Sequence, residues 1–300
     1  MTESTGKESS DIEEMLDIEF NSQMLDELDG RVVLIKYGGN AMRDDEIKRK
    51  VIADIVALKD YDIVPVVVHG GGPVIKKLLK DVGIESEFVG GHRKTDKKAM
   101  RYVEMALSGQ VNSDLVKGLN RAGCKAVGLS GKDGNMVIAN QRKHVVQVDG
   151  QTEEIDLGHV GNVKRINTDL VKAIIKEGYI PVIAPIGVGE DMKDYNINAD
   201  MFAGHMAGAL EAARFVALTD VDGLLEDPED ETSLIPEMSV EEAQDEMEKT
   251  IQGGMIPKVE ACLIALKEGV EEAHIVNGMK PHTILKQLLT QKPTGTRFVK

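Results

Sequence analysis

The sequence predicts an α/β protein built on a mainly parallel sheet, and three observations support this class. Two short apolar runs, 32–35 and 63–68, have the composition of buried strands, and each ends in glycines before a helical pattern begins. Repeated strand, loop and helix units are typical of parallel sheets covered by helices. Aromatic residues make up only 3% of the chain, with no Trp, which favours aliphatic parallel-sheet packing over an all-β sandwich.

Length and composition limit the domain organisation and the possible functions. The 300 residues suit one large domain or two lobes, and a hydrophobic content of 42% is ample for a core. The net charge of -15 argues against nucleic-acid binding, which needs a cationic face. Cys124 and Cys262 lie far apart in apolar contexts, so we expect neither a disulfide framework nor a zinc site, and a reducing cytoplasm fits best. An acidic N-terminus and the absence of an apolar run of about 20 residues argue against export and membrane insertion.

The N-terminal segment carries a helical pattern. Apolar residues recur at every fourth position from Ile12 to Leu28, which predicts an amphipathic helix over 11–28. The apolar stripe of this helix must pack on its own domain or on another subunit, and the pattern favours neither.

The stretch 31–42, RVVLIKYGGNAM, is the first candidate for a ligand site. Lys36 follows the apolar run, and Gly38 and Gly39 come directly after it. Glycines let backbone N–H groups approach a ligand, and the lysine adds positive charge at the same point, a combination that suits phosphate. A plain turn has the same pattern. A helical pattern over 44–59 completes the first strand, loop and helix unit.

A second glycine loop, HGGGP at 69–73, ends the next strand. Pro73 suits the first turn of the helix predicted over 74–81, so Gly71, Gly72 and the helix N-terminus would converge on an anion. Two such loops at neighbouring strand tips favour a phosphate or carboxylate site over two independent turns. Neither loop makes GxGxxG with an acid about 20 residues on, and no GxxxxGK[ST] occurs, which disfavours a common dinucleotide oxidoreductase and a P-loop ATPase.

The basic segment 90–101, GGHRKTDKKAMR, contains one cation placed for ligand binding. Most of its charges fit a solvated helix face. Arg93 instead lies in the loop before the helix, where a guanidinium can hold a carboxylate through two hydrogen bonds. Farther along, helical sequence to 116 and a strand at 126–129 precede an alternating stretch over 136–155, which predicts β-hairpins that would cover a ligand.

Three polar side chains alternate within DYNINAD at 194–200, after a predicted helix over 169–176 and a strand over 179–185. Asn196, Asn198 and Asp200 would therefore point the same way. Capping of the small-residue helix that follows accounts for one of the three but not for all.

The C-terminal part contains an acidic loop and a second lysine beside glycines. The strand predicted over 214–219 enters the loop 220–225, DVDGLL. GGMIPK at 253–258 places Lys258 after two glycines and before a helix over 259–267. An acidic helix capped by Ser239 lies between these motifs, and a strand (273–276), a helix (281–289) and a GTRFV tail end the chain.

Seven motifs in this order resemble the amino acid kinase family over residues 29–300. They are KYGGNAM, VVVHGGGP, GHRKTD, GLSGKDGN, NINAD, LTDVDGLL and GGMIPKVE. The resemblance implies a three-layer αβα sandwich with an open, mainly parallel central sheet and an additional N-terminal helix. It further implies ATP-dependent phosphorylation of the side-chain carboxylate of N-acetyl-L-glutamate, a step of arginine (ornithine) biosynthesis. Residues 1–28 would then be an extension, 29–212 the acetylglutamate-binding lobe and 213–300 the ATP-binding lobe.

The resemblance also assigns roles to individual residues. The catalytic residues would be Lys36, Lys258 and Asp200, with Asp200 holding the two lysines in register. The acceptor would be bound by Gly71, Gly72, Arg93, Asn196 and Asn198. ATP would be bound by Gly38, Gly39, Thr219, Asp220, Val221, Asp222, Gly223, Leu224, Leu225 and Gly254. Mg²⁺ would be carried by ATP, so no protein metal site is expected.

The residues agree with this chemistry. A side-chain carboxylate is ionised at pH 7, since an unperturbed Glu titrates near ~4.3, so the reaction needs no general base. It needs relief of repulsion between two anions, which lysines, glycine N–H groups and Mg²⁺ supply. Two alternatives stay open: a kinase that acts on an aminoadipate derivative or aspartate, and a non-catalytic amino-acid sensor, which retention of both lysines and Asp200 argues against.

The N-terminal helix resembles that of the hexameric, arginine-inhibited branch of the family. The resemblance implies a homo-oligomer, a dimer or a hexamer joined through this helix, and feedback inhibition by arginine. The sensitive branch usually has a glutamate where this chain has Lys286-Gln287, and a glycine-rich pair where it has Lys292-Pro293. We therefore expect weak arginine binding, with Glu271 or Glu272 as a substitute carboxylate.

Overall fold

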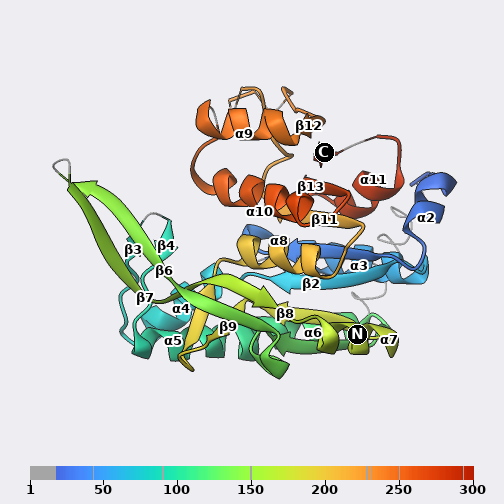
Figure 1. Cartoon of the computed structure of the whole chain (residues 1–300). Coiled ribbons are helices and arrows are strands. Elements are labelled where there is room, and N and C mark those ends of the chain that lie inside the picture. The colour runs from blue at the N-terminus through green and yellow to red at the C-terminus, as the bar shows by residue number, and fades with distance from the viewer. Residues whose placement is uncertain are drawn as a thin grey trace.

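One eight-stranded sheet forms the centre of the computed structural model, which describes residues 18–300 apart from 43, 90, 149–150, 228, 231, 250 and 293 (Figure 1). Its strand order is β12-β14-β13-β11-β1-β2-β8-β5. The strands are β12 (Glu237–Ser239), β14 (Thr296–Val299), β13 (Glu272–Asn277), β11 (Arg214–Thr219), β1 (Val32–Tyr37), β2 (Val64–His69), β8 (Ile180–Ala184) and β5 (Ala126–Ser130). The β13–β14 pair is antiparallel and its neighbours are parallel, so the open, mainly parallel sheet is confirmed.

Helices cover both faces of the sheet, because successive strand residues point to opposite sides. In β1, Val33 and Ile35 join one apolar cluster, while Leu34 joins another on the opposite face. The first face carries α3 (Asp45–Asp60), α6 (Asn112–Arg121) and α11 (Thr283–Leu289). The second face carries α7 (Asp169–Lys176), α8 (Ala199–Ala209) and α10 (Ile256–Lys267). The three-layer αβα sandwich is therefore confirmed.

A long hairpin extends away from the sheet, formed by β6 (Val137–Val148) and β7 (Gln151–Ile166) and drawn in green in Figure 1. Its base closes into a four-stranded ring with β9 (Ile186–Gly189) and β10 (Asp194–Ile197). The short strands β3 (Phe88–Val89) and β4 (His92–Arg93) pair beside it. The expected hairpin is confirmed, although its predicted turn at 149–150 lies outside the described residues.

The remaining helices begin at side-chain caps or glycine loops. They are α4 (Gly72–Asp81), α5 (Lys97–Glu104) and α9 (Val240–Lys249). Ser239 and Glu242 form a reciprocal capping box at the start of α9, with N···O distances of 2.8 and 3.2 Å. One expectation needs correction: the helical stretch over 100–116 contains a π-helical segment, η2 (Met105–Val111), between α5 and α6.

The continuous helix predicted over 11–28 is wrong in its described part. Residues 18–21 are not helical, and α2 spans only Ser22–Leu28; residues 1–17 lie outside the description. Asn21 is the N-cap at which α2 begins: its backbone is extended, and its side-chain oxygen accepts from the N–H groups of Gln23 (2.9 Å) and Met24 (3.4 Å). The Asn21 N–H donates to the Leu289 carbonyl at 2.8 Å, so this part folds back on its own domain.

The sheet continues across the expected lobe boundary at 212/213. Leu34 of β1 is in register with Phe215 of β11, and both side chains belong to the same apolar cluster. The two lobes thus share one sheet, and their assignment to two ligands stays a proposal. In the described ranges no helix combines the length and apolar character needed to cross a membrane.

Candidate active site

The first candidate catalytic residue, Lys36, lies near the carboxyl end of β1. It is two residues after Leu34, so its side chain points to the face covered by α8. Asp200 lies in the first turn of α8, and its Oδ1 is 2.8 Å from Lys36 Nζ. Both side chains are buried, Lys36 with 5% and Asp200 with 7% of its surface exposed. A buried pair of this kind holds the ammonium in one place.

Lys258 completes a cluster of three charges from three elements. It lies in the first turn of α10, and its Nζ donates to the Gly254 carbonyl at 3.0 Å. Burial alone raises the pKa of the Asp200 carboxyl, but the charges of Lys36 and Lys258 hold it below its ordinary value. Burial lowers the pKa of Lys258, which Lys36 lowers further and which Asp200 and Asp220 oppose. The Asp200 carboxylate therefore interacts electrostatically with both lysines, and its role in holding them in register stays a prediction.

The two glycine loops meet beside the Lys36 ammonium. A Cβ on Gly38 would lie 3.3 Å from Lys36 Nζ and 3.5 Å from the backbone nitrogen of Gly70. Glycine thus keeps open the space between the cation and the second loop. The Tyr37 hydroxyl donates to the Ala41 carbonyl at 2.7 Å and holds the first loop against its own strand. Both loops lie at the carboxyl ends of parallel strands, where open α/β sheets bind ligands.

Arg93 presents a guanidinium that no carboxylate of the described residues pairs with. It lies on β4, donates to the Ser86 hydroxyl, and stacks over the Phe88 ring at 4.6 Å from the centroid. Burial lowers the pKa of Arg93. These two contacts orient the guanidinium without neutralising it, which leaves it able to hold an anionic ligand.

The two asparagines differ in what their side chains do. Asn196 lies on β10, paired with Val160 and Ile186. Asn198 is the N-cap of α8, and its side-chain oxygen accepts from the N–H groups of Asp200 (2.8 Å) and Met201 (3.2 Å). That oxygen therefore positions the first turn that carries Asp200. Acceptor binding by Gly71, Gly72, Arg93, Asn196 and Asn198 stays a prediction.

Four of the residues expected at ATP line a cavity of about 800 Å³ between the 220–226 loop and α9. These are Val221, Gly223, Leu224 and Leu225. Thr219 is the last residue of β11 and Asp220 follows it. Gly38 lies beside Lys36 and Gly254 beside Lys258, whereas Gly39 begins the 3₁₀ turn Gly39–Met42. Asp222 accepts from Asn277 Nδ2 at 2.7 Å and pairs with Lys280, so its carboxylate braces the loop. Nucleotide binding by all ten residues stays a prediction.

Some residues that shape the site gave no signal in the sequence. Thr296 in the tail accepts from the Leu224 N–H at 2.8 Å and donates to the Ile235 carbonyl at 2.7 Å, which fixes the cavity loop to β14. The other cavity residues come from β12, α9 and the segment before α10, including Met238, Ile251 and Met255.

The residues present suit a nucleotide triphosphate better than a metal held by protein. Two ammonium groups and two glycine loops match phosphate oxygens, and the apolar side of the cavity matches a base. In the part of the chain that the structure describes, no group of three or more His, Cys, Asp or Glu side chains could hold a metal ion.

A mainly parallel αβα sandwich with two glycine loops at the carboxyl ends of its strands, and with two lysines that interact with one buried aspartate, is typical of phosphotransferases. The model described as "Amino acid kinase family" matches residues 31–277. The chain belongs to the amino acid kinase family.

Similar proteins carry the name acetylglutamate kinase. The acetylglutamate kinase of Syntrophobacter fumaroxidans is 48% identical over 275 residues, 90% of this chain and 91% of that protein. The acetylglutamate kinase of Moorella thermoacetica is 45% identical over 271 residues, 90% of this chain and 92% of that protein. The structure of N-acetylglutamate synthase from Neisseria gonorrhoeae, complexed with coenzyme A and N-acetyl-glutamate, has a TM-score of 0.79 at 23% identity and covers 93% of this chain and 62% of that one. This structural likeness shows a shared fold.

Proposed function

We propose that this chain transfers the γ-phosphoryl group of ATP to the side-chain carboxylate of N-acetyl-L-glutamate. The products are N-acetylglutamyl 5-phosphate and ADP. The observation that carries the proposal is the buried Lys36–Asp200 pair, with Lys258 coupled to it, beside two glycine loops. The acceptor is inferred from the relatives named acetylglutamate kinase, which match over 90% of this chain.

The residues act on charge rather than on protons. The acceptor carboxylate is already ionised, so no general base is needed. Lys36 and Lys258 reduce the repulsion between this carboxylate and the triphosphate, and they stabilise negative charge on the oxygens of the moving group. Asp200 keeps both ammonium groups in position. Mg²⁺ bound to ATP would add further neutralisation of the phosphate oxygens.

The cavity and the two lysines would bind different parts of ATP. The adenosine part would occupy the cavity beside Val221 and Leu224, where the walls are largely apolar and glutamates can accept from ribose hydroxyls. The phosphates would extend past Gly254 to Lys258 and Lys36. Arg93 would hold the acceptor carboxylate that does not react, because its guanidinium is oriented and not paired with an acid.

The test is ADP release that depends on N-acetyl-L-glutamate. We expect turnover with acetylglutamate to exceed turnover with the acetylated homologue one carbon longer and with aspartate. Faster turnover with either alternative would replace the proposed acceptor, and absence of ATP consumption with all three would favour a non-catalytic sensor. A lysine variant away from the site, Lys117→Ala, should keep the wild-type rate of ADP release, because Lys117 pairs with Asp114 on the exposed face of α6.

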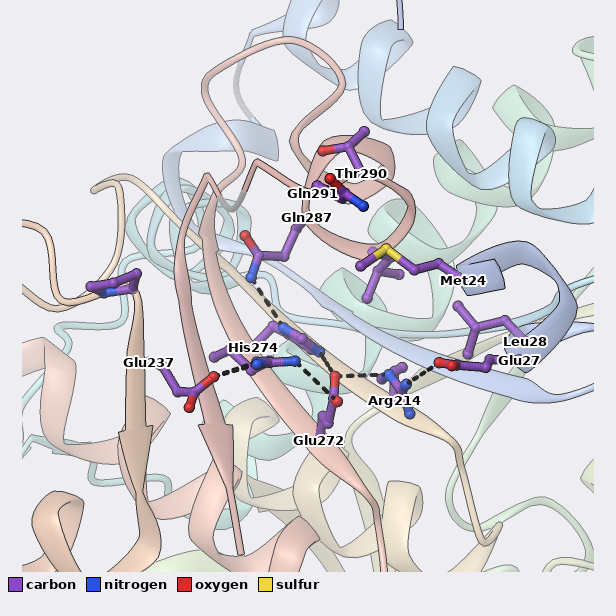
Figure 2. A pocket seen from close by; sticks show the side chains of 13 residues that line it. Met24, Glu27, Leu28, Arg214, Glu237, Glu272, His274, Gln287, Thr290 and Gln291 are labelled. Atoms are coloured by element: carbon purple, nitrogen blue, oxygen red, sulfur yellow. Dashed lines mark hydrogen bonds and ion pairs between the residues drawn. The ribbon is translucent and has the colours of Figure 1, made fainter. Parts of the chain in front are cut away.

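We further propose that arginine binds weakly beside α2. A cavity of about 440 Å³ lies there between α2, α11 and β13 (Figure 2). Glu271 already accepts from Arg31 and Arg214, and Glu272 pairs with Arg214 and Arg297, so neither carboxylate is free for a guanidinium. Arginine must compete with these pairs.

Gln287, one of two residues that stand where the arginine-sensitive branch usually has a glutamate, also favours weak arginine binding, because its side chain is uncharged and already hydrogen-bonded. Its side-chain oxygen accepts from the N–H groups of Thr294 and Gly295, both at 2.8 Å, and its amide nitrogen lies 3.2 Å from His274 Nδ1. The missing glutamate removes one charge-assisted contact, which amounts to about ten- to a hundredfold in affinity. Titration of activity with arginine tests this. Half-inhibition only at millimolar arginine supports weak binding, whereas tight inhibition or complete insensitivity contradicts it.

We also propose a pathway, a cellular compartment and an oligomeric state for this enzyme. The enzyme would act in arginine biosynthesis in the cytoplasm, which agrees with the two free cysteines, Cys124 and Cys262. It would form dimers that associate into hexamers through the N-terminal segment.

A further inference from the structure

A buried histidine and asparagine lie directly behind the second glycine loop, and the mechanism above does not use them. His69 is the last residue of β2 and is fully buried. Its Nδ1 is 2.9 Å from the Gly70 carbonyl oxygen, and its Nε2 is 3.1 Å from Asn112 Nδ2. The ring therefore connects the loop to the start of α6.

The hydrogen-bond partners determine the tautomer of His69. A carbonyl oxygen can only accept, so Nδ1 carries the proton. Asn112 presents its amide nitrogen, because the same nitrogen is 2.8 Å from the Val182 carbonyl oxygen and 3.4 Å from that of Leu129. Nε2 must then be the acceptor. Burial lowers the pKa of His69 to about 4, so the ring is neutral at physiological pH.

This arrangement controls where one backbone N–H points. The Gly70 carbonyl and the Gly71 N–H belong to the same planar trans peptide and point in opposite directions. Because His69 holds the carbonyl towards the core, the Gly71 N–H is directed away from it. Gly71 is the N-cap of α4, and the first N–H groups of a helix have no partner within the helix.

The π-helical segment η2 brings the second support to the same loop. A Cβ on Gly71 would lie 2.6 Å from Leu107 Cδ2 and 3.3 Å from Val111 Cγ2, so η2 packs tightly against the loop. Asn112 follows η2 directly, and a Cβ on Gly128 would lie 1.9 Å from its side-chain oxygen. A π-helical segment is uncommon and is often found at functional sites.

We propose that His69 and Asn112 are positioning residues that orient the Gly70–Gly71 peptide for phosphoryl transfer. The Gly71 N–H held in this way donates to the transferring group or to the acceptor carboxylate. The role assigned to His69 and Asn112 rests on the proposed phosphoryl transfer.

The test compares two substitutions of His69 in the full chain. In His69→Asn the amide nitrogen takes the place of Nδ1 and can still donate to the Gly70 carbonyl. In His69→Leu the volume remains but no donor does. We expect kcat to fall about 100-fold in His69→Leu, with KM for both substrates changed less than about threefold, and His69→Asn to recover at least about tenfold of that loss. The surface change His205→Leu is the matched control, with wild-type kinetics expected.

Equal kcat values for the asparagine and leucine variants would overturn the proposal, as would a change confined to KM. If His69→Leu does not fold, Asn112→Leu gives the second comparison, with the same loss of kcat expected and an unchanged kcat contradicting the proposal. ¹⁵N NMR of the wild-type ring is independent of activity: protonation at Nδ1 supports the assignment, and protonation at Nε2 or a charged ring overturns it. Failure of the proposed function differs, since wild type itself would then release no acetylglutamate-dependent ADP.

Discussion

At the scale of single residues, Lys36 and Lys258 should stabilise the transition state more strongly than they stabilise the bound substrates. We predict that Lys36→Ala and Lys258→Ala each lower kcat about 100-fold or more, because each ammonium acts on charge that develops during transfer. KM for ATP and acetylglutamate should change much less. Steady-state kinetics with both substrates varied measures this. A variant with near-normal kcat and only weaker ATP binding would exclude its lysine from that role.

Arg93 should govern binding of the acceptor. Its guanidinium is held by Ser86 and Phe88, so it is pre-oriented for a planar carboxylate. We predict that Arg93→Lys raises KM for acetylglutamate about 10- to 100-fold, since a point charge cannot replace a fork of two donors. KM for ATP serves as the internal control. If KM for ATP rises while that for acetylglutamate stays constant, Arg93 belongs to the nucleotide site.

At the scale of elements, Glu272 at the start of β13 links three strands. It pairs with Arg214 of β11 at 3.0 Å and with Arg297 of β14 at 3.3 Å. His274, whose Nε2 lies 3.5 Å from the Glu272 carboxylate, and the charges of Arg214 and Arg297 together lower the pKa of Glu272 to about 2, and burial opposes them. The pKa is lower in the folded than in the unfolded chain. The stabilisation is therefore present above pH 4.5, the ordinary value, and is lost as pH falls towards 2.

We predict that this loss appears in the free energy of unfolding. Between pH 4.5 and 2 the wild type should lose about 2 kcal/mol more than Glu272→Gln, after allowance for solvent screening. Urea unfolding at a series of pH values measures it. Glu241→Gln, on the exposed side of α9, is the control and should keep the wild-type slope. Parallel pH curves for wild type and Glu272→Gln would show that the pair contributes nothing.

At the scale of the whole molecule, the N-terminal segment offers a test of assembly. A truncation that tests assembly should keep α2, because Leu28 is buried in the core and α2 packs on α11. We predict that removal of residues 1–17 converts hexamers to dimers with nearly unchanged kcat, because the lysines and glycine loops lie elsewhere. Light scattering reports the mass. An unchanged mass after deletion would reject assembly through this segment.

Local patterns were sufficient for much of the fold and for part of the site. Apolar runs and helical spacing predicted β11 and α7 with the bounds observed, because strand and helix periodicity are properties of neighbouring residues. Glycines beside Lys36 and His69 marked both loops for the same reason. The seven motifs, taken in order, indicated the family to which the chain belongs.

The sequence by itself thus determined the class of fold, the two glycine loops and the residues that resemble a kinase site. Only the tertiary structure decided how Lys36, Asp200 and Lys258 meet, because they come from β1, α8 and α10, and contacts between distant elements leave no local pattern. It also decided the break before α2, where the Leu289 carbonyl accepts from Asn21, and the π-helical η2 that packs on Gly71. At the break the local Asn21 cap and the distant Leu289 carbonyl act together, and at η2 the packing partner Gly71 is distant in sequence, so the spacing of apolar residues alone predicts neither feature.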